Sequence, residues 1–277
     1  MTGAYPFSAA VPRRWLSRTT KRRLTALLQY AAIFAVGYLA VATMDWPEFQ
    51  RNFLNLDVAV QMFPKILTVA LVNTLVYSVL GFIVGIVLGL VLALMKTSNN
   101  GLYRWVAILY IEVFRGLPAL LVLFFIGYGI PIAYGHSLPG GTIVAIALGI
   151  GLIGAAYMGE TIRAGIQSVP RGELEAAKSL GMPKIHVLRH VVIPQAFRTI
   201  TPPLMNEFIA LVKDSSLVYV LGVTTTSLEL TKFGRNNLDQ FVNVTPLFVV
   251  GLCYLAITFP LARIVEHLER KRRKARQ

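Results

Sequence analysis

The sequence predicts an all-α membrane protein that crosses the bilayer about six times. Of its 277 residues, 55% are hydrophobic and only 14% are charged. A soluble domain averages about 25% charged residues, because its surface must face water. The apolar residues also gather in runs as long as the roughly 20 residues that a helix needs to cross a bilayer. These two observations exclude one large soluble core and predict a polytopic membrane protein.

Polar or helix-breaking stretches separate the apolar runs into six predicted spans. The spans are Leu24–Met44, Ile66–Met95, Leu102–Ile126, Thr142–Ile162, Pro203–Val223 and Phe241–Leu261. The first run follows basic residues, so a signal peptide is the alternative interpretation. Its length of about 21 residues exceeds a signal peptide's apolar core of roughly 7–15, and no clear small-x-small cleavage site follows it. We therefore predict a retained span.

The net charge of +14 could suggest nucleic-acid binding, but its distribution along the chain argues otherwise. With the N-terminus inside the cell, 21 of the 27 basic residues fall in cytoplasmic segments and four in external loops, and the remaining two, Arg115 and Lys213, lie at membrane depth. The opposite orientation would reverse this bias and break the positive-inside rule. We predict that both termini are cytoplasmic.

Regularly spaced glycines predict close helix packing inside the membrane. Gly81, Gly85 and Gly89 recur every four residues in the second span, and Gly151, Gly154 and Gly159 thin the fourth. Helices in lipid associate through such small residues, because the backbones can then approach closely. The packing partner is either the same chain or a second subunit.

The segment between the fourth and fifth spans predicts two short cytoplasmic helices joined by a tight turn. Pro170 and Pro183 suit helix starts, where a missing N–H costs nothing, and Gly181 suits a left-handed end to the first helix. Leu174, Ala177 and Leu180 share one face of that helix, and Ile185 and Leu188 continue the apolar pattern in the second. The apolar face packs either on the protein's own helices or in a groove of a soluble partner.

A family pattern covers this hairpin. Glu175-Ala176-Ala177, Gly181 four residues later, and Val191-x-Ile193-Pro194 together resemble the EAA loop of bacterial ABC importer permeases. Every spacing of that pattern is present. The two departures are mild: Val191 stands where the family has isoleucine, and Ile193 where it has leucine.

Further stretches resemble the polar amino acid branch of this family. They are Phe114–Pro118, with Leu117 in place of threonine, Gly165–Pro170, Asn206–Phe208 and Leu211–Leu217. The resemblance implies a five-helix permease domain over residues 58–265. Residues 1–57 would add an N-terminal segment, one further span and an external linker, and residues 266–277 a basic tail.

The resemblance also implies a function and partners. The chain would be the non-enzymatic permease subunit of an ATP-driven importer of polar amino acids in the bacterial inner membrane. It would work with a second permease subunit, two ABC ATPases and an extracytoplasmic substrate-binding protein, and would hold no cofactor or metal. Which amino acid is carried, and whether the permease dimer is homo- or heteromeric, stays open.

Energy must arrive through contact, because the chain has no Gly-x4-Gly-Lys-Ser/Thr phosphate loop. We expect the hairpin to move with the ATPases and to swing the attached spans. The expected coupling residues are Arg171, from the polar face of the first hairpin helix, and Glu175, Ala176, Ala177, Gly181 and Pro194, from the resemblance. His186 and His190 are four residues apart but lack a third ligand, so we interpret them as surface groups.

Ionisable groups at membrane depth are costly and are often functional. The candidates for the substrate pathway are Lys213, Asp214, Ser215, Ser216, Glu160 and Glu207. Lys213 and Asp214 either form an internal ion pair or recognise the two charges of an amino acid. Glu112 and Arg115, three residues apart, are expected to pair near the start of the third span.

Two other functional classes remain as alternatives. A secondary carrier or channel would work without an ATPase and would not need a hairpin with EAA spacing. A membrane enzyme would need a nucleophile–base pair or a metal cluster at membrane depth, and the sequence shows neither.

Overall fold

The computed structural model describes residues 18–221 and 227–274, and it divides the chain into two compact units, Met1–Arg51 and Asn52–Gln277. The predicted domain boundary after residue 57 lies slightly farther along the chain than this division. Residues 1–17 of the predicted N-terminal segment and residues 275–277 of the tail lie outside the described residues.

The first unit contains one long apolar helix. Helix α1 spans Arg18–Ala42, and its part from Lys21 to Ala42 is long and apolar enough to cross a membrane, as predicted. Its described apolar side chains are exposed, which suits a helix that meets lipid. Helix α2, Trp46–Phe53, begins in this unit, where the carboxylate of Asp45 accepts a hydrogen bond from the Glu48 N–H.

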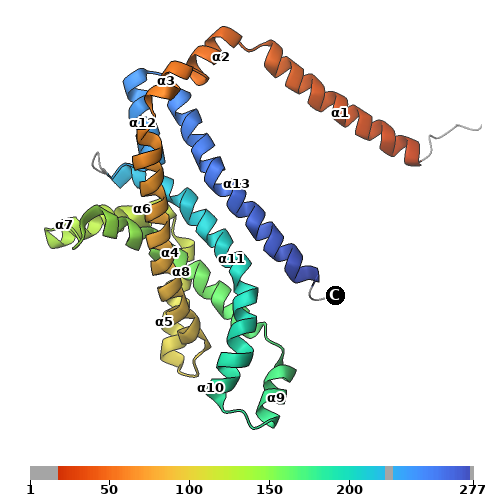
Figure 1. The fold of residues 1–277 in the computed structure, drawn as a ribbon, viewed down its shortest axis with the longest axis vertical. Helices are drawn as coiled ribbons and strands as arrows, with labels where there is room; N and C mark the ends of the chain where they lie inside the picture. Colours follow the sequence, from red (N-terminus) through yellow and green to blue (C-terminus); the bar gives the residue numbers. More distant parts are fainter. Residues whose placement is uncertain (1–17, 222–226, 275–277) are drawn as a thin grey trace, which may run out of the picture. The chain divides into compact units, whose positions relative to one another are not determined.

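The second unit is all helical in the part of the chain that is described (Figure 1). Its elements are α3 (Leu56–Gln61), the π-helix η1 (Ile66–Leu71), α4 (Val72–Thr97), α5 (Gly101–Gly116), α6 (Ala119–Phe124), the π-helix η2 (Phe125–Gly129), α7 (Ile130–Tyr134), α8 (Gly141–Gln167), α9 (Arg171–Ser179), α10 (Lys184–Val187), the π-helix η3 (Leu188–Val192), α11 (Ile193–Asp214), the 3-10 helix η4 (Ser215–Leu221), α12 (Leu230–Phe241) and α13 (Thr245–Lys274). The α9–α10 hairpin lies at one end of this unit, and α3 and α12 lie at the other (Figure 1).

The glycines of α4 and α8 bring these two helices into backbone contact. A Cβ added at Gly89 would lie 2.9 Å from the backbone nitrogen of Gly159, and one at Gly151 would lie 3.0 Å from the backbone oxygen of Gly81. Real Cβ contacts are not that short, so larger residues would force the helices apart. The predicted close packing is confirmed, and its partner is the same chain.

The third predicted span is not one straight helix. Helix α5 and the helical segment Ala119–Tyr134, which begins with α6, meet at an angle of 106°. Pro118 cannot continue the hydrogen-bond pattern of α5, and it pushes Leu117 into an extended conformation with φ −85° and ψ 138°. The apolar run Leu102–Ile126 therefore hides a break, and the residues on either side of it face different parts of the protein.

Four described helices are long and apolar enough to cross a membrane, and five if the bent pair counts as one span. The predicted fifth span corresponds to α11 continued by η4. This segment is not apolar enough to count among the four, because α11 carries charged groups, among them Glu207, Lys213 and Asp214. The predicted basic tail is not a separate element, because α13 continues unbroken through it to Lys274.

Helix α12 is held by a buried carboxylate. Glu229 is fully buried, and its side chain accepts hydrogen bonds of 2.6 Å from the N–H groups of Thr231 and Lys232. The hydroxyl of Tyr254 on α13 donates to the same carboxylate at 3.3 Å. Burial outweighs these hydrogen bonds and raises the pKa of Glu229 to about 7.

Candidate functional site

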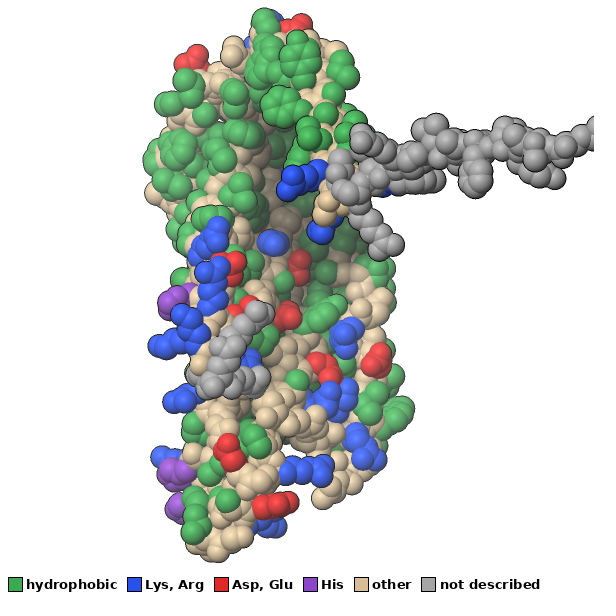
Figure 2. Space-filling view, turned by 90° about the vertical axis from the view of Figure 1, so that its right-hand side faces the viewer, with side chains coloured by type: hydrophobic (Ala, Val, Ile, Leu, Met, Phe, Trp, Pro, Cys, Tyr) green, Lys and Arg blue, Asp and Glu red, His purple; other side chains and the backbone are tan. Residues whose placement is uncertain are grey.

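The hairpin between α8 and α11 has the predicted local structure. Helix α9 begins after Pro170 and ends at Ser179, and Gly181, two residues later, has the predicted left-handed conformation with a φ of +74°. The N–H of Gly181 donates to the carbonyl of Lys178 at 2.9 Å, and the N–H of Met182 donates to that of Ala177 at 3.2 Å. These bonds satisfy the last carbonyls of α9, as expected for a glycine-terminated helix. In Figure 2, charged side chains gather over the half of the molecule that holds α9 and α10.

The hairpin has a small core of its own. Val169, Ala177, Val187 and Val192 are buried against one another. The side-chain amide of Gln195 on α11 also donates a short hydrogen bond to the carboxylate of Glu173 on α9. The hairpin is thereby joined to the start of α11, so α9, α10 and α11 can move together.

Three further apolar side chains of the hairpin are exposed. Leu180 is 82% exposed, Ile185 67% and Leu188 45%. Packing on the protein's own helices is therefore confirmed for part of the apolar pattern, and the groove on a soluble partner stays a prediction. Ala177 packs within the hairpin, whereas Leu180, Ile185 and Leu188 form an exposed apolar tip at its turn.

Of the predicted coupling residues, Ala177 is buried in the hairpin core and the others are exposed. Arg171, Glu175 and Ala176 are exposed on α9, and Pro194 is exposed at the start of α11.

The imidazole rings of His186 and His190 stack 5.6 Å apart, and both side chains are exposed. Among the described residues, no group of three or more potential metal ligands was found.

Two of the predicted pathway residues share a cavity within the helix bundle. The cavity has a volume of 260 Å³ and is lined by Glu207 and Asp214 of α11, Tyr157 of α8, and residues around the α5–α6 break such as Leu117. Glu207 and Asp214 are seven residues apart, so they lie on one face of α11 two turns apart. The guanidinium of Arg115 lies 5.5 Å from the ring centre of Tyr157 and interacts electrostatically with Glu207.

Arg115 and Tyr157 were not among the predicted pathway residues. The predicted pairing of Arg115 with Glu112 near the start of the third span is wrong. Arg115 lies in the last turn of α5, about 21 Å along the helix from Gly101, and in the described ranges no ion pair joins it to Glu112. The prediction failed because it treated the third span as one straight helix. Pro118 is the residue from which the break between α5 and α6 could have been predicted.

The other predicted pathway residues lie elsewhere. Lys213 lines a separate groove against α13, beside Tyr254 and Leu255. Ser215 is fully buried, and its hydroxyl donates to the carbonyl of Val212 at 2.8 Å. Ser216 is half-buried in η4. The stretch 213–216 therefore does not face one space.

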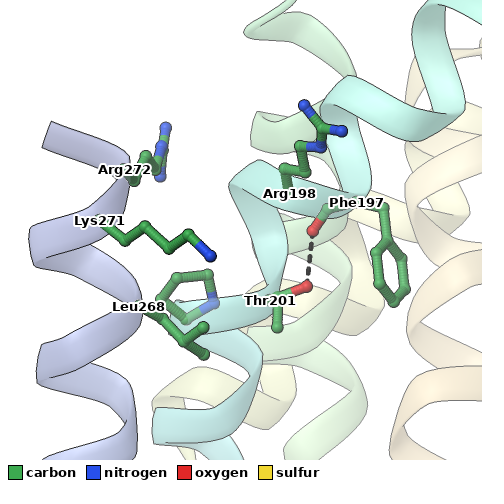
Figure 3. A pocket seen from close by; sticks show the side chains of 7 residues that line it. Phe197, Arg198, Thr201, Leu268, Lys271 and Arg272 are labelled. Carbon is green, nitrogen blue, oxygen red and sulfur yellow. Dashed lines mark hydrogen bonds between the residues drawn. The ribbon is translucent and has the colours of Figure 1, made fainter. Parts of the chain in front are cut away.

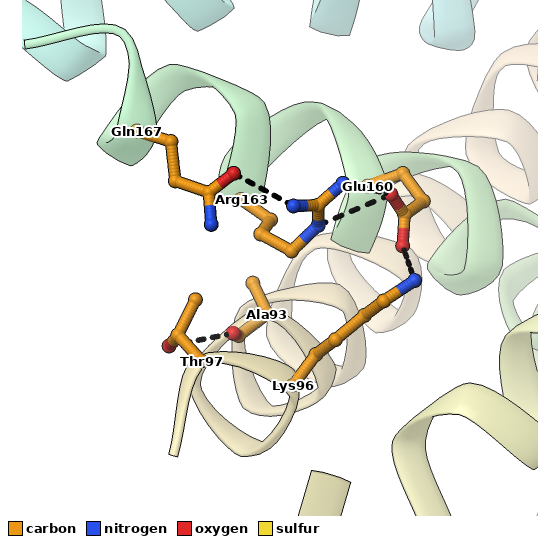
Figure 4. A network of polar contacts seen from close by, with 6 residues as sticks. All are labelled: Ala93, Lys96, Thr97, Glu160, Arg163 and Gln167. Atoms are coloured by element: carbon orange, nitrogen blue, oxygen red, sulfur yellow. Dashed lines mark hydrogen bonds and ion pairs between the residues drawn. The ribbon is translucent and has the colours of Figure 1, made fainter. Parts of the chain in front are cut away.

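Glu160 belongs to an ion-pair network that joins α4 to α8 (Figure 4). Its carboxylate lies 2.5 Å from the ammonium of Lys96 and 2.8 Å from the guanidinium of Arg163. Arg163 in turn donates to the side-chain oxygen of Gln167 at 2.7 Å. The three charged side chains are only 20–27% exposed. The network therefore holds the end of α4 to α8, and none of its residues lines the cavity of Glu207.

Three comparisons relate this geometry to known proteins. Residues 85–274 match the family model described as the binding-protein-dependent transport system inner membrane component. The chain is 36% identical to the L-cystine transport system permease protein TcyB of Bacillus subtilis, over 78% of this chain and 90% of that protein. It is 34% identical to the arginine transport system permease protein ArtQ of the same organism, over 64% of this chain and 79% of that protein.

The fold agrees with a solved structure of the same type. A crystal structure of an amino acid ABC transporter with histidines matches with a TM-score of 0.68 and 34% identity, and covers 77% of this chain and 96% of that one. The family match extends over the hairpin, the cavity and α13. The chain therefore belongs to the family of binding-protein-dependent transport inner membrane components, the non-catalytic permease subunits of ABC importers.

Proposed function

We propose that the chain imports polar amino acids and that its permease pathway includes the cavity of Glu207 and Asp214. A zwitterionic amino acid carries one ammonium and one carboxylate, and both need partners of opposite charge at membrane depth. The cavity offers two carboxylates, and Arg115 lies beside it. The relatives that are named for arginine and L-cystine transport support this substrate class.

Ser215, Ser216 and Glu160 have structural roles in this proposal, and Lys213 lies outside the cavity, in the groove against α13. Ser215 and Ser216 continue α11 directly after Asp214, so they hold the end of the cavity-lining helix in place. Glu160 and its cations hold α4 against α8, close to the hairpin that follows α8. A substrate contact at membrane depth is assigned to Glu207 and Asp214 alone among the predicted residues.

The hairpin is proposed as the ATPase contact. Its exposed tip of Leu180, Ile185 and Leu188 is apolar, as expected for a helix that enters a groove on a partner. Arg171 and Glu175 are exposed beside it and are available for polar contacts. Because Glu173 is hydrogen-bonded to Gln195, movement of the hairpin is transmitted to α11, which carries the cavity carboxylates.

The proposed assembly contains a second permease subunit, either another copy or a different chain, two ABC ATPases and an extracytoplasmic binding protein. We propose that both termini are cytoplasmic, because this orientation puts the basic α9–α10 hairpin on the same side as the ATPases.

Uptake by the reconstituted system tests the function. The purified chain is assembled in proteoliposomes with its ATPase, its binding protein and any second permease subunit, and the uptake of radiolabelled polar amino acids is measured. We expect uptake that requires ATP inside the hairpin-facing compartment. Uptake that continues without the ATPase would instead identify a secondary carrier or channel.

A further inference from the structure

A second pocket, separate from the proposed pathway, lies between α11 and the C-terminal turns of α13 (Figure 3). Its volume is 550 Å³. Arg198 and Thr201 line it from α11, and Leu268, Lys271 and Arg272 line it from α13. The Lys271 side chain points from α13 toward α11 (Figure 3).

The charges of this pocket are all positive. Its three charged lining residues are Arg198, Lys271 and Arg272, and no acidic residue lines it. Within the described residues, neither Arg198 nor Lys271 takes part in an ion pair. Arg272 donates one hydrogen bond of 3.2 Å to the carbonyl of Thr199, which holds α13 to α11 and keeps its charge at the pocket. Three cations around one cavity without a counterion favour an anionic ligand.

The pocket also has an apolar wall. Leu268 lines it from α13, Pro202 and Phe197 line it from α11, and Phe197 is 63% exposed. A small soluble anion would leave this apolar wall exposed to water. An anion attached to hydrocarbon fits it, because its chains can pack against Leu268 and Pro202 while its charge meets the cations.

The position along the helices fits a lipid headgroup. A bilayer core takes about 20 helical residues, so a span that begins at Thr245 leaves the hydrocarbon a few residues before Leu268. On α11, Arg198 and Thr201 come just before the apolar run that starts at Pro203. Both walls of the pocket therefore reach the depth of the headgroups on the side of the hairpin.

We propose that this pocket binds the phosphate of an acidic membrane phospholipid, with Arg198 and Lys271 as its charge partners. Basic pockets between spans on the cytoplasmic side are suited to such headgroups. The proposal does not depend on which solute the protein transports. In this proposal the basic end of α13 binds one lipid headgroup at a defined site, through Lys271.

Lipid titration of the full chain tests the proposal. The purified protein in detergent receives phosphatidylglycerol, phosphatidylcholine or inorganic phosphate, and bound molecules are counted by native mass spectrometry. The variants are Arg198→Gln, Lys271→Gln and their combination. Arg270→Gln is the matched control, because Arg270 lies on the same helix end but pairs with Glu266 and does not line the pocket. Elution volume and thermal unfolding verify that each variant is folded, and the single variants serve if the double variant is not.

We expect a preference for phosphatidylglycerol over phosphatidylcholine that falls roughly fivefold with each charge removed and is unchanged in Arg270→Gln. Equal binding of the two lipids would overturn the proposal. Binding of inorganic phosphate as tight as that of the lipid would also overturn it and identify a soluble anion site. A double variant that keeps its lipid preference but no longer co-purifies with the ATPase would show that the pocket is a protein interface.

Discussion

Lys213 and Asp214 are adjacent in α11, yet they line different cavities. Asp214 shares its cavity with Glu207 and Tyr157, whereas Lys213 lies in the groove against α13. Successive residues of a helix point about 100° apart, so two neighbours at the edge of a helix face can serve different surfaces. Because of this separation, Asp214 and not Lys213 lines the cavity that we propose as part of the pathway.

Removal of the cavity carboxylates should slow transport. Asp214→Asn and Glu207→Gln each remove a charge that we propose pairs with the substrate ammonium, and a hydrogen bond to a charged group contributes about 1.5–3 kcal/mol. We expect uptake at low substrate concentration to fall roughly ten- to hundredfold. Lys213→Gln serves as the control and should have a much smaller effect. If Lys213→Gln alone abolished uptake, the pathway would run along the α13 groove.

Substitutions at Gly181 should act through backbone strain alone. A Cβ at this position would meet no atom within 4 Å, but φ is +74°. Alanine in this conformation costs about 1–2 kcal/mol, whereas asparagine tolerates it better. We expect stimulated ATPase activity in the order glycine, asparagine, alanine, measured in the reconstituted complex. Equal activities for Gly181→Asn and Gly181→Ala would mean that the left-handed turn is not needed for coupling.

The exposed apolar tip should contribute to ATPase binding but not to folding. Leu180→Ala removes a side chain that is 82% exposed, and burial of a leucine in a partner's groove contributes about 1.5–3 kcal/mol. We expect roughly ten- to hundredfold weaker binding of the ATPase, measured by a pull-down titration, with an unchanged unfolding midpoint. Ile132→Ala is the control, since Ile132 is equally exposed, on α7. A matching loss of binding for Ile132→Ala would show that the assay does not report on the hairpin.

The Lys96–Glu160–Arg163 network should respond asymmetrically to substitution. Lys96→Gln leaves Glu160 paired with Arg163, whereas Glu160→Gln leaves two cations without their shared partner. We therefore expect the unfolding midpoint in detergent to fall more for Glu160→Gln than for Lys96→Gln. The double variant should show a coupling energy of about 0.5–3 kcal/mol. Strict additivity would show that the ion pair does not hold α4 to α8.

The stability of α12 should depend on pH through Glu229. Burial raises the pKa of its carboxyl from 4.5 to about 7, so the folded protein binds this proton more tightly than the unfolded chain does. The corresponding stability is fully present below about pH 4.5 and is lost as pH rises through 7. Hydrogen exchange at the α12 amides should quicken over this range beyond the intrinsic increase. In Glu229→Gln, which carries no titrating group, this additional pH dependence should disappear.

The membrane class and the hairpin were predictable because their signals are local. The apolar runs, the charge bias and the spacing from Pro170 to Pro194 depend only on the order of residues. The left-handed conformation of Gly181 is likewise a property of its own neighbourhood. The same holds for the glycines of α4 and α8, whose four-residue spacing places them on one helix face.

The cavity was only partly predictable because it depends on which faces of distant helices meet. Glu207 and Asp214 were predicted as costly charges at membrane depth, but Asp214 was grouped with Lys213, and Arg115 was paired with Glu112. The 106° break at Pro118 carries the end of α5 to Tyr157. The sequence by itself therefore determined the class of protein, its apolar runs and the hairpin between α8 and α11. Only the tertiary structure decided which charges share a space, because helix rotation and helix breaks place a side chain relative to residues far away in the chain.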